Sequence, residues 1–574
     1  MSEPNPARVL AARVLERVRR GKRFSGDELE RALRGTGLGR EDRALTTTLV
    51  YGTLRHQGTI DWVLGKAANV KPDRVHPVTL DHVRVGAYQM LYLARIPAFA
   101  AVNDAVELVR RAGGRRAAGF TNAVLRALGR VLASAQLATG AAGATGGIVA
   151  GEAAGTVASG AAGASGGAGA DGAVGVAGGT GAAGATRGAG AGGAAGMAGG
   201  SGATGSTEGA GASGAAGAAG RNVASGAAEA AGGACAGEAA GVAGGAGASG
   251  AARASAAPVA ASGSARRDLP RGDGTCAVFG SDFLPDPADA VEHLAVTLSQ
   301  PTWLVARWLA RFGRERTESI CRGGLAPPPV TLRVNRLKGS RDALLARLPG
   351  AEPGDDPWSI RLRTPGAVSE LPGYAEGAFV VQDEASMRVA QLLEPRAGGA
   401  YVDLCAAPGG KSTHLAELMA DRGRVLALDP QRQRLAKLAE ACRRLGLRSV
   451  RWVCADGRKP PLAHAAWDGV LLDAPCSNTG VLARRVEARW RLRAGDVAAL
   501  AEIQIELLCA AAALVRPGGR MVYSTCSVEP EENEERVALF LHAMGGNWTQ
   551  GSAEMSWPAP GRSGGFSAVL ERRP

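Results

Sequence analysis

Residues 400–429 read AYVDLCAAPGGKSTHLAELMADRGRVLALD, and this stretch decides the fold of the C-terminal part of the chain. A short apolar run at 401–405 comes before a Gly-Gly pair, and an amphipathic helical pattern follows at 412–420. A second apolar run, 425–429, ends at Asp429. A strand, a glycine turn, a helix and another strand in this order predict a β-α-β unit with parallel strands.

The same alternation continues towards the C-terminus. Further strands are expected at 450–455, 469–473, 520–524 and 568–570, and helices at 431–445 and 497–515. Apolar strands that alternate with helices predict a mostly parallel, doubly wound α/β sheet of the Rossmann-like class. Such sheets bind their ligands at the carboxyl ends of the strands.

The loop Asp403-Leu-Cys-Ala-Ala-Pro-Gly-Gly-Lys-Ser412 is the first candidate binding site. A Gly-Gly pair between a strand and a helix lets a ligand approach bare backbone at a helix N-terminus. A phosphate-binding P-loop is the alternative, because Gly410-Lys411-Ser412 ends like one. That motif needs a glycine five residues before Gly410, where Cys405 stands, so we disfavour it.

Acidic residues end the next two expected strands, at Asp429 and Asp456. An acid about twenty residues beyond the glycine turn is where a ribose diol would be held. Either aspartate taken alone is as readily a helix cap or a turn residue. Together they fit an adenosine-type ligand without phosphate, and they predict S-adenosylmethionine (SAM) as the cofactor.

Two cysteines follow later strands, in Asp473-Ala-Pro-Cys476 and in Ser524-Thr-Cys526. Most cysteines are buried and inert, but two at strand ends of one sheet favour a catalytic site. Carbon 5 of a pyrimidine is a weak nucleophile. A thiolate that adds to carbon 6 makes carbon 5 enamine-like, so that it can take a methyl group from a sulfonium. The spacing alone leaves open which thiol attacks.

These motifs, with Pro530-Glu-Glu-Asn533, resemble the Sun-type RNA cytosine-C5 methyltransferase family. The resemblance implies that Cys526 is the nucleophile, that Cys476 assists product release and that Asp473 stabilises the cytosine adduct. It also implies a set of residues that contact the cofactor or lie beside the target base: Cys405, Ala406, Ala407, Pro408, Gly409, Gly410, Lys411, Asp429, Asp456 and Asp473.

Two segments depart from the family pattern. The family often has Arg-Arg-His-Pro-Asp-Ile-Lys-Trp after the Pro-Cys motif, whereas Ala483-Arg-Arg-Val-Glu-Ala-Arg-Trp490 stands here. The His-Pro step is absent, and Val486 and Glu487 put a local RNA contact in doubt. Near the C-terminus, residues 565–570 lack the usual paired aromatic residues.

The N-terminal part has a helical pattern throughout. Apolar residues recur at helical spacing over 7–18, 80–93 and 102–109, and Gly or Pro separates these segments. Arginines cluster at 19–23 and 110–116, where a plain solvated surface explains them as readily as RNA binding does. The strings at 51–56, 86–92 and 120–126 resemble the NusB-like RNA-binding domain, and this resemblance implies an RNA-binding role.

Between residues 141 and 250 the chain holds 39 Gly and 41 Ala, no aromatic residue and only seven charged residues. Such a stretch buries too little apolar surface to offset its ordering entropy, so it predicts a disordered spacer. We therefore expect a multidomain chain of four parts. They are an all-α NusB-like RNA-binding domain (1–133), a disordered Gly/Ala-rich linker (134–275), a small α+β subdomain (276–395) and a Rossmann-like SAM-dependent methyltransferase domain (396–574).

The net charge of +13 favours a polyanionic partner, with solubility alone as the alternative. Nine cysteines without a Cys-x-x-Cys pair indicate neither a disulfide framework nor a zinc site. The N-terminus lacks a signal-peptide pattern, so the cytoplasm is expected.

The two resemblances together imply an enzyme that uses SAM to methylate carbon 5 of a cytosine in 16S rRNA, and we expect it to be monomeric, without a metal or a membrane. The alternatives are the same chemistry on tRNA or 23S rRNA, and a non-catalytic NusB-like RNA-binding factor.

Overall fold

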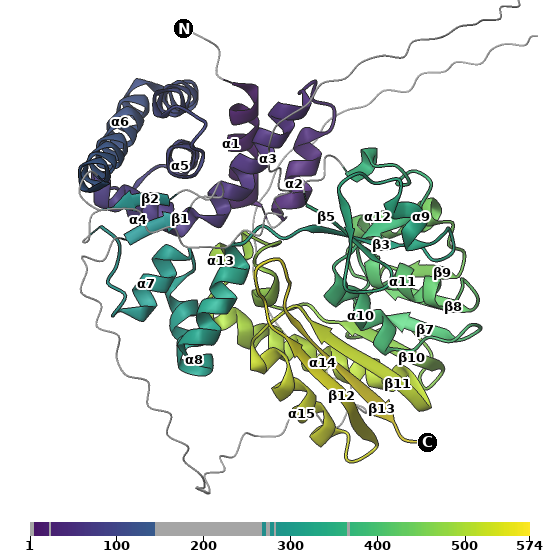
Figure 1. Ribbon diagram of the computed structural model, residues 1–574. Coiled ribbons are helices and arrows are strands. Elements are labelled where there is room, and N and C mark those ends of the chain that lie inside the picture. The colour runs from purple at the N-terminus through teal and green to yellow at the C-terminus, as the bar shows by residue number, and fades with distance from the viewer. Residues whose placement is uncertain (1–4, 22–23, 144–266, 271–275, 280–282, 364–367) are drawn as a thin grey trace, which may run out of the picture. The chain divides into compact units, whose positions relative to one another are not determined.

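The computed structural model describes residues 5–21, 24–143, 267–270, 276–279, 283–363 and 368–574 (Figure 1). The N-terminal domain consists of the helices α1 (Pro6–Arg20), α2 (Ser25–Leu33), α3 (Arg40–Arg55), α4 (Gln57–Ala68), α5 (Pro77–Tyr92) and α6 (Ala98–Gly143). Local signals set their limits. The Asn5 side chain accepts hydrogen bonds from the backbone N–H groups of Ala7 and Arg8 and so caps α1. Helix α4 ends at Asn69 in the left-handed conformation.

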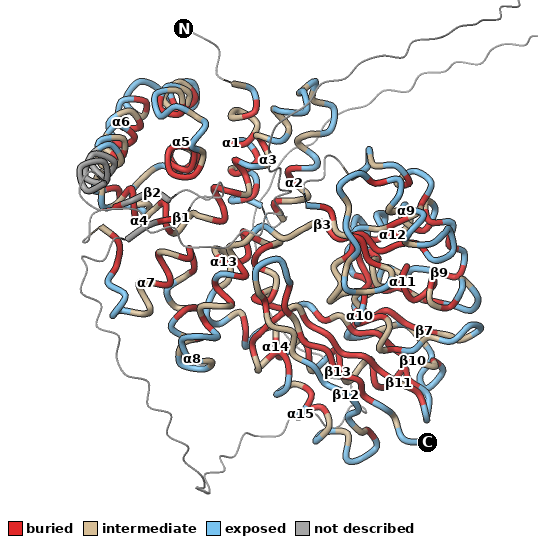
Figure 2. Tube along the Cα trace, viewed as in Figure 1, coloured by how far each residue is buried: buried red, intermediate tan, exposed pale blue. Residues whose placement is uncertain are grey.

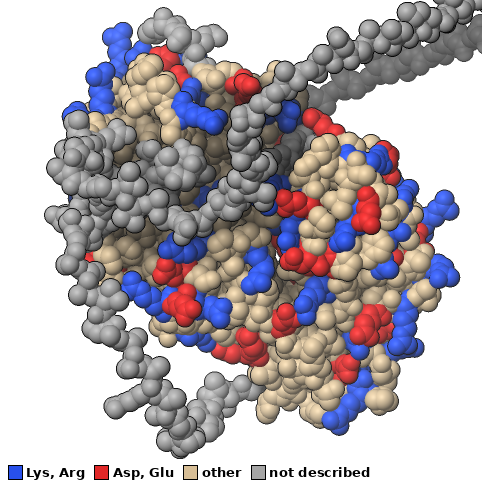
Figure 3. All heavy atoms as spheres, in the orientation of Figure 1, with Lys and Arg blue, Asp and Glu red and all other residues tan. Residues whose placement is uncertain are grey.

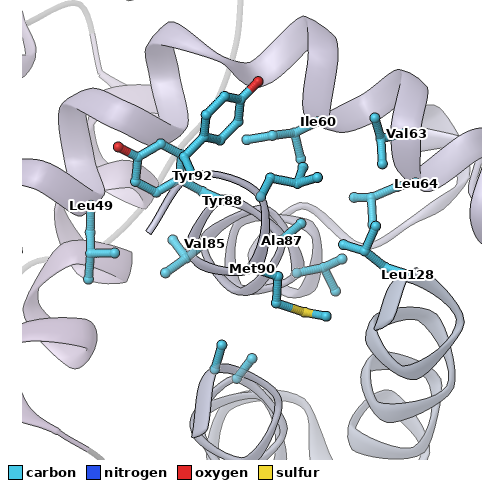
Figure 4. Close-up of a cluster of buried hydrophobic side chains, with 14 of the residues drawn as sticks. Leu49, Ile60, Val63, Leu64, Val85, Ala87, Tyr88, Met90, Tyr92 and Leu128 are labelled. Atoms are coloured by element: carbon cyan, nitrogen blue, oxygen red, sulfur yellow. The ribbon is translucent and has the colours of Figure 1, made fainter. Parts of the chain in front are cut away.

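Helix α5 is the centre of this domain, because every residue from Thr79 to Tyr92 is buried. Figure 4 shows its side chains among those of the neighbouring helices. Gly52 of α3 lets the two helices meet, since a Cβ atom at this position would lie 2.0 Å from the Tyr88 ring. The string at 51–56 that resembles NusB-like domains therefore contains a helix-packing contact, and the predicted all-helical domain is confirmed.

A small α+β subdomain follows. Helices α7 (Ala290–Thr297) and α8 (Thr302–Leu325) precede an antiparallel sheet with the order β4-β5-β3-β6. Its strands are β3 (Val330–Val334), β4 (Ala351–Pro353), β5 (Ser359–Leu362) and β6 (Phe379–Val381), with α9 (Arg341–Leu345) after β3. Helix α10 (Glu384–Leu392) leads into the next domain, and Asp383 caps it by accepting a hydrogen bond from the Ala385 backbone.

The predicted linker, 134–275, lies mainly outside the described residues. At both ends of this range the structure has regular elements where the prediction had a disordered linker. Helix α6 continues to Gly143, and strand β1 (Arg267–Pro270) pairs antiparallel with β2 (Cys276–Phe279). The sequence did not reveal β1, because its four residues follow the Gly/Ala-rich stretch without an apolar alternation of useful length.

The C-terminal domain is built on a seven-stranded mixed sheet with the order β12-β13-β11-β10-β7-β8-β9. Its parallel strands are β7 (Ala400–Asp403), β8 (Arg424–Leu428), β9 (Val450–Val453), β10 (Trp467–Asp473) and β11 (Val515–Thr525). The chain runs outward from β7 through β8 to β9 and then crosses to β10 and β11. The strand order therefore reverses between β7 and β10, which is where ligands of such sheets bind.

Successive side chains of the central strands enter two different cores. Val470 and Leu472 of β10 pack with α14 (Ala494–Leu514) and α15 (Glu534–Ala543), whereas Leu471 between them packs with α11 (Gly410–Leu418) and α12 (Arg432–Leu445). Helices thus cover both faces of the sheet, as the sequence predicted, and Figure 2 shows the buried residues along these strands.

Antiparallel strands complete the sheet at one edge. The predicted strand at 568–570 is part of β13 (Gly565–Arg572), which pairs antiparallel with β11 and with β12 (Trp548–Ser556). The sequence analysis missed β12. Its residues WTQGSAEMS are mostly exposed and show no apolar alternation, as suits an edge strand.

Among the described residues, α14 alone has the length and apolar composition of a membrane span. Half of its most apolar window is buried, and Leu507, Leu508 and Leu514 belong to the core beneath the sheet. The helix therefore has the packing of a core helix.

Candidate active site

The loop between β7 and α11 brings bare backbone to the switch point of the sheet. Gly409 has φ 108°, and a Cβ atom there would lie 2.4 Å from Leu438 Cδ1, so both the backbone and the neighbour exclude a side chain. Asp403, at the end of β7, is buried and accepts a hydrogen bond from Ser412 Oγ at 2.6 Å. Burial raises the pKa of Asp403 to about 7.

The second oxygen of Asp403, Oδ1, is buried and has no partner among the described residues. A buried acceptor without a donor fits a site that takes a polar ligand. Asp429, at the end of β8, lies on the same side: its Oδ2 accepts from the Ala407 N–H at 3.3 Å, and its Oδ1 from the Gln431 N–H at 2.8 Å. The loop residues and the two acids therefore fit an adenosyl ligand.

Two predicted cofactor residues have other surroundings. Asp456 is exposed, and the Arg458 guanidinium donates to both of its oxygens and lowers its pKa. Burial, with the nearby carboxylates of Asp403, Asp473 and Asp429, raises the pKa of Cys405 far above its ordinary value. The structure therefore places Asp456 in a local ion pair, and Cys405 as an unreactive thiol in the loop.

A lysine and an aspartate connect the loop to the next strand. Lys411 Nζ lies 2.7 Å from Asp473 Oδ2, and Ser524 Oγ donates to Asp473 Oδ1 at 2.8 Å. Burial alone would lower the pKa of Lys411, but the carboxylates of Asp473 and Asp403 outweigh it, so the pKa is raised. Lys411 is therefore a fixed cation, and Asp473 remains partly exposed at the carboxyl end of β10.

The two predicted thiols meet. Cys476 Sγ and Cys526 Sγ are 3.0 Å apart, and the backbone N–H of Cys526 donates to Cys476 Sγ at 3.3 Å. Cys476 is buried, whereas Cys526 is partly exposed. The contact with Cys526, together with burial, raises the pKa of Cys476 well above its ordinary value. The buried thiol of Cys476 therefore keeps its hydrogen.

Three family models match the chain. They are the NusB family over residues 5–130, the ferredoxin-like domain of RsmF/B-like methyltransferases over 300–369, and the 16S rRNA methyltransferase RsmB/F over 390–554. The C-terminal region thus matches the RsmB/F methyltransferases, and the matches to the NusB family and to the ferredoxin-like domain lie ahead of it in the chain.

Individual relatives are similar to the chain over these regions. The chain is 28% identical over 540 residues to "Probable ribosomal RNA small subunit methyltransferase B" of Bacillus subtilis, an alignment of 93% of this chain and 88% of the relative. It is 44% identical over 251 residues to ribosomal RNA small subunit methyltransferase B of Proteus mirabilis, covering 42% of this chain and 59% of the relative. The crystal structure of PH0851 matches with a TM-score of 0.63 at 21% identity, over 100% of both chains, and so shares the fold.

A buried clamp that the sequence analysis did not assign holds the two thiol loops together. Glu532 is fully buried and accepts from the N–H and Oγ of Ser477, beside Cys476. Ser477 Oγ in turn lies 3.0 Å from Ser527 Oγ, beside Cys526. These residues are about fifty positions apart in sequence, so no local spacing could have revealed the contact, although Glu532 lies in the quoted Pro-Glu-Glu-Asn motif.

The segment that departs from the family pattern is largely internal. Glu487 is 2% exposed and accepts from the N–H of Ser25 at 3.1 Å and its Oγ at 2.6 Å. Val486 is buried in the core of the helical domain, and Trp490 Nε1 donates to the Leu54 carbonyl at 2.7 Å. The side chains of Val486 and Glu487 thus contact other parts of this chain.

The basic residues of the helical domain are partly neutralised. Arg19 pairs with Asp81, and Arg110 and Arg111 both pair with Glu107. Figure 3 shows Lys and Arg side chains mixed with Asp and Glu on the visible face of the described residues. Three arginines of the two sequence clusters are therefore already paired with carboxylates of the same domain.

Proposed function

We propose that the chain uses SAM to methylate carbon 5 of a cytosine in 16S rRNA through a covalent adduct with Cys526. The observation that carries the proposal is the contact between two thiols at the ends of neighbouring strands, beside the Lys411–Asp473 pair and the glycine loop. A family match to rRNA methyltransferases of the small subunit supports the substrate class.

In this mechanism the Cys526 thiolate attacks carbon 6 of the cytosine, so that a bond forms between sulfur and carbon 6 and carbon 5 becomes nucleophilic. Bound SAM supplies the methyl group that carbon 5 takes. Asp473, held by Lys411 and Ser524, is the acid placed to bind N3 and the exocyclic amine. The carbon 5 proton then passes to solvent water, the carbon 5–carbon 6 double bond forms again, and the bond between carbon 6 and the Cys526 sulfur breaks, which releases the thiolate.

Cys476 is suited to the last step. Its raised pKa keeps a hydrogen on its sulfur, 3.0 Å from the Cys526 sulfur. A thiol at this distance can donate a hydrogen bond to the departing thiolate and so stabilise it. We therefore assign the nucleophile to Cys526 and the product-release role to Cys476.

We also propose that the helical domain (1–133) holds the RNA. The target base then leaves its stack and enters the site. The ferredoxin-like subdomain lies between this domain and the methyltransferase domain in sequence, and the thiol sites belong to the region from 396 onward. The cytoplasm is the location that a ribosomal RNA substrate requires.

Single substitutions of the two cysteines test this function. Cys526→Ala should abolish methylation, whereas Cys476→Ala should trap a covalent protein–RNA adduct that a denaturing gel detects. An adduct from Cys526→Ala and none from Cys476→Ala would reverse the assignment. Bisulfite sequencing of rRNA from a deletion strain tests the substrate, because unchanged 16S methylation would point to tRNA or 23S rRNA.

A further inference from the structure

Asn478 touches the proposed nucleophile, and neither the sequence motifs nor the mechanism gives it a role. The Cys526 thiol donates to Asn478 Oδ1 at 3.3 Å. The Asn478 amide nitrogen donates to the Cys476 carbonyl oxygen at 2.7 Å. One side chain therefore contacts both thiol loops.

The second contact fixes the orientation of the amide. A backbone carbonyl oxygen only accepts hydrogen bonds, so the NH2 group of Asn478 must face the Cys476 carbonyl. The amide oxygen must then face Cys526 Sγ, and the exchange of nitrogen and oxygen that leaves many asparagines ambiguous is ruled out here.

The hydrogens of the two thiols can be assigned in the same way. Each thiol has one hydrogen, and that of Cys526 points to the Asn478 oxygen. The contact of 3.0 Å between the sulfurs then takes its hydrogen from Cys476, whose sulfur also accepts from the Cys526 N–H. In this arrangement each thiol hydrogen has an acceptor.

We propose that Asn478 is a further catalytic residue, whose amide oxygen keeps the hydrogen on the Cys526 sulfur until the target base enters the site. The inference rests on the proposed function, in which Cys526 attacks the base. An amide oxygen binds a thiol but turns the negative end of its dipole towards a thiolate, so it disfavours the thiolate. When the base displaces the thiol from the amide, the S–H bond breaks and the proton passes to solvent water.

The charged groups around Cys526 set the balance against which Asn478 acts. Lys411 of α11 favours a negative sulfur, but Asp473 at the end of β10 pairs with this lysine at 2.7 Å. Cys476 donates from its own loop, and Glu532 of η4 (Pro530–Glu532) faces Cys476. Because the charges of Lys411 and Asp473 offset each other, a neutral acceptor such as Asn478 can shift the balance between the thiol and the thiolate of Cys526.

Two substitutions of opposite effect test the proposal. Asn478 has φ 64°, which glycine adopts without strain, so Asn478→Gly removes the amide and leaves the backbone free to keep its shape. Asn478→Asp keeps the shape of the side chain and adds a negative charge. The assay is alkylation of the full chain by iodoacetamide without RNA, followed by mass spectrometry of the Cys526 peptide across a pH series.

Asn478→Gly should alkylate Cys526 on the order of threefold to tenfold faster at neutral pH, since the net effect of one hydrogen bond has that size. Its reactivity profile should move to lower pH. Asn478→Asp should react more slowly, with its profile at higher pH. The exposed thiol of Cys454, measured in the same digest, is the internal control and should not change.

Equal Cys526 reactivity in all three proteins, or the opposite order, would overturn the role of Asn478. Neither result depends on methylation, so the role of Asn478 and the proposed methyltransferase function can be refuted independently of each other. If Cys526→Ala still methylates RNA, the proposed nucleophile is wrong, whereas the alkylation order still reports the Asn478 contact. If Asn478→Gly alters Cys454 reactivity or lowers Tm, Asn478→Ser takes its place, because serine also removes the amide oxygen. Asn478→Ser should then alkylate Cys526 faster than the wild-type chain, and an equal or slower rate would overturn the role of Asn478.

Discussion

The buried ion pair between Arg333 and Glu417 tests how helix α11, which follows the glycine loop, is held in place. Arg333 of β3 is 1% exposed and Glu417 of α11 is 0% exposed. The guanidinium donates to both Glu417 oxygens at 3.1 and 2.8 Å, to the Gly410 carbonyl at 2.8 Å, to Thr413 Oγ1 at 3.1 Å and to the Gln382 side chain. All five of its N–H groups are therefore bound.

Arg333→Met keeps the length of the side chain and removes the charge. The Glu417 carboxylate would then be buried without a partner, at a cost of about 3–5 kcal/mol. Since about 1 kcal/mol shifts Tm by roughly 2–4 °C in a domain of this size, the expected decrease in Tm is roughly 6–20 °C. The double variant Arg333→Met/Glu417→Leu removes both charges and should recover most of this loss.

The loss should also depend on pH. Burial already outweighs Arg333 and raises the pKa of Glu417, and removal of Arg333 would raise it further. An acid whose folded-state pKa is raised is stabilised by protonation, so its unfavourable contribution grows as pH rises through that pKa. The destabilisation by Arg333→Met should therefore be smaller at pH 5 than at pH 8.

Calorimetric unfolding of the full chain measures these effects, and Arg347 provides a matched control. Arg347 makes the same two-bond contact with Glu376 at 2.9 and 2.6 Å, but both side chains are about half exposed. Arg347→Met should leave the unfolding transition unchanged, because water replaces the partner. If Arg333→Met shifts the transition no more than Arg347→Met, the buried pair does not hold α11.

Two further predictions concern other buried acids. The folded-state pKa of Asp403, about 7, exceeds its ordinary value of about 3.9. The free energy of unfolding should thus be highest below pH ~4, where Asp403 is protonated in both states, and should fall by up to about 4 kcal/mol as pH rises to ~7. Asp403→Asn should flatten this decline, and denaturation curves measured without ligand test it. Glu487 caps the N-terminus of α2, where Phe24 provides no side-chain cap. Glu487→Ala and Ser25→Ala should each lower the free energy of unfolding by about 0.5–2 kcal/mol. Because the two side chains touch, the double variant should lose less than the sum, and additive losses would contradict a direct contact.

The sequence predicted the features that depend on local pattern. The parallel strands of the sheet were found because Val470–Leu472 and their counterparts form continuous apolar runs that both faces bury. The glycine loop and both thiols were found because each follows such a run. Edge strands carry no such signal, which is why β12 was missed.

What the sequence could not predict depends on contacts between distant residues. The Ser477–Glu532 clamp and the Asn478–Cys526 contact join two loops that only the parallel pairing of β10 and β11 brings together. Such contacts follow from strand order, which spacing along one chain does not contain.

The departure from the family pattern at Val486 and Glu487 is accompanied by matching contacts elsewhere in the chain. A carboxylate at a helix N-terminus is favourable because the N–H groups of the first turn lack partners. Glu487 has this position at α2, and Ser25 supplies both a backbone and a hydroxyl donor. The same stretch of chain is held at its other end, where Ser477 binds Glu532. The residues from 477 to 487 run from the thiol loop to the helical domain, and each end of this stretch has hydrogen bonds of its own. These contacts hold the stretch at both ends without the His-Pro step.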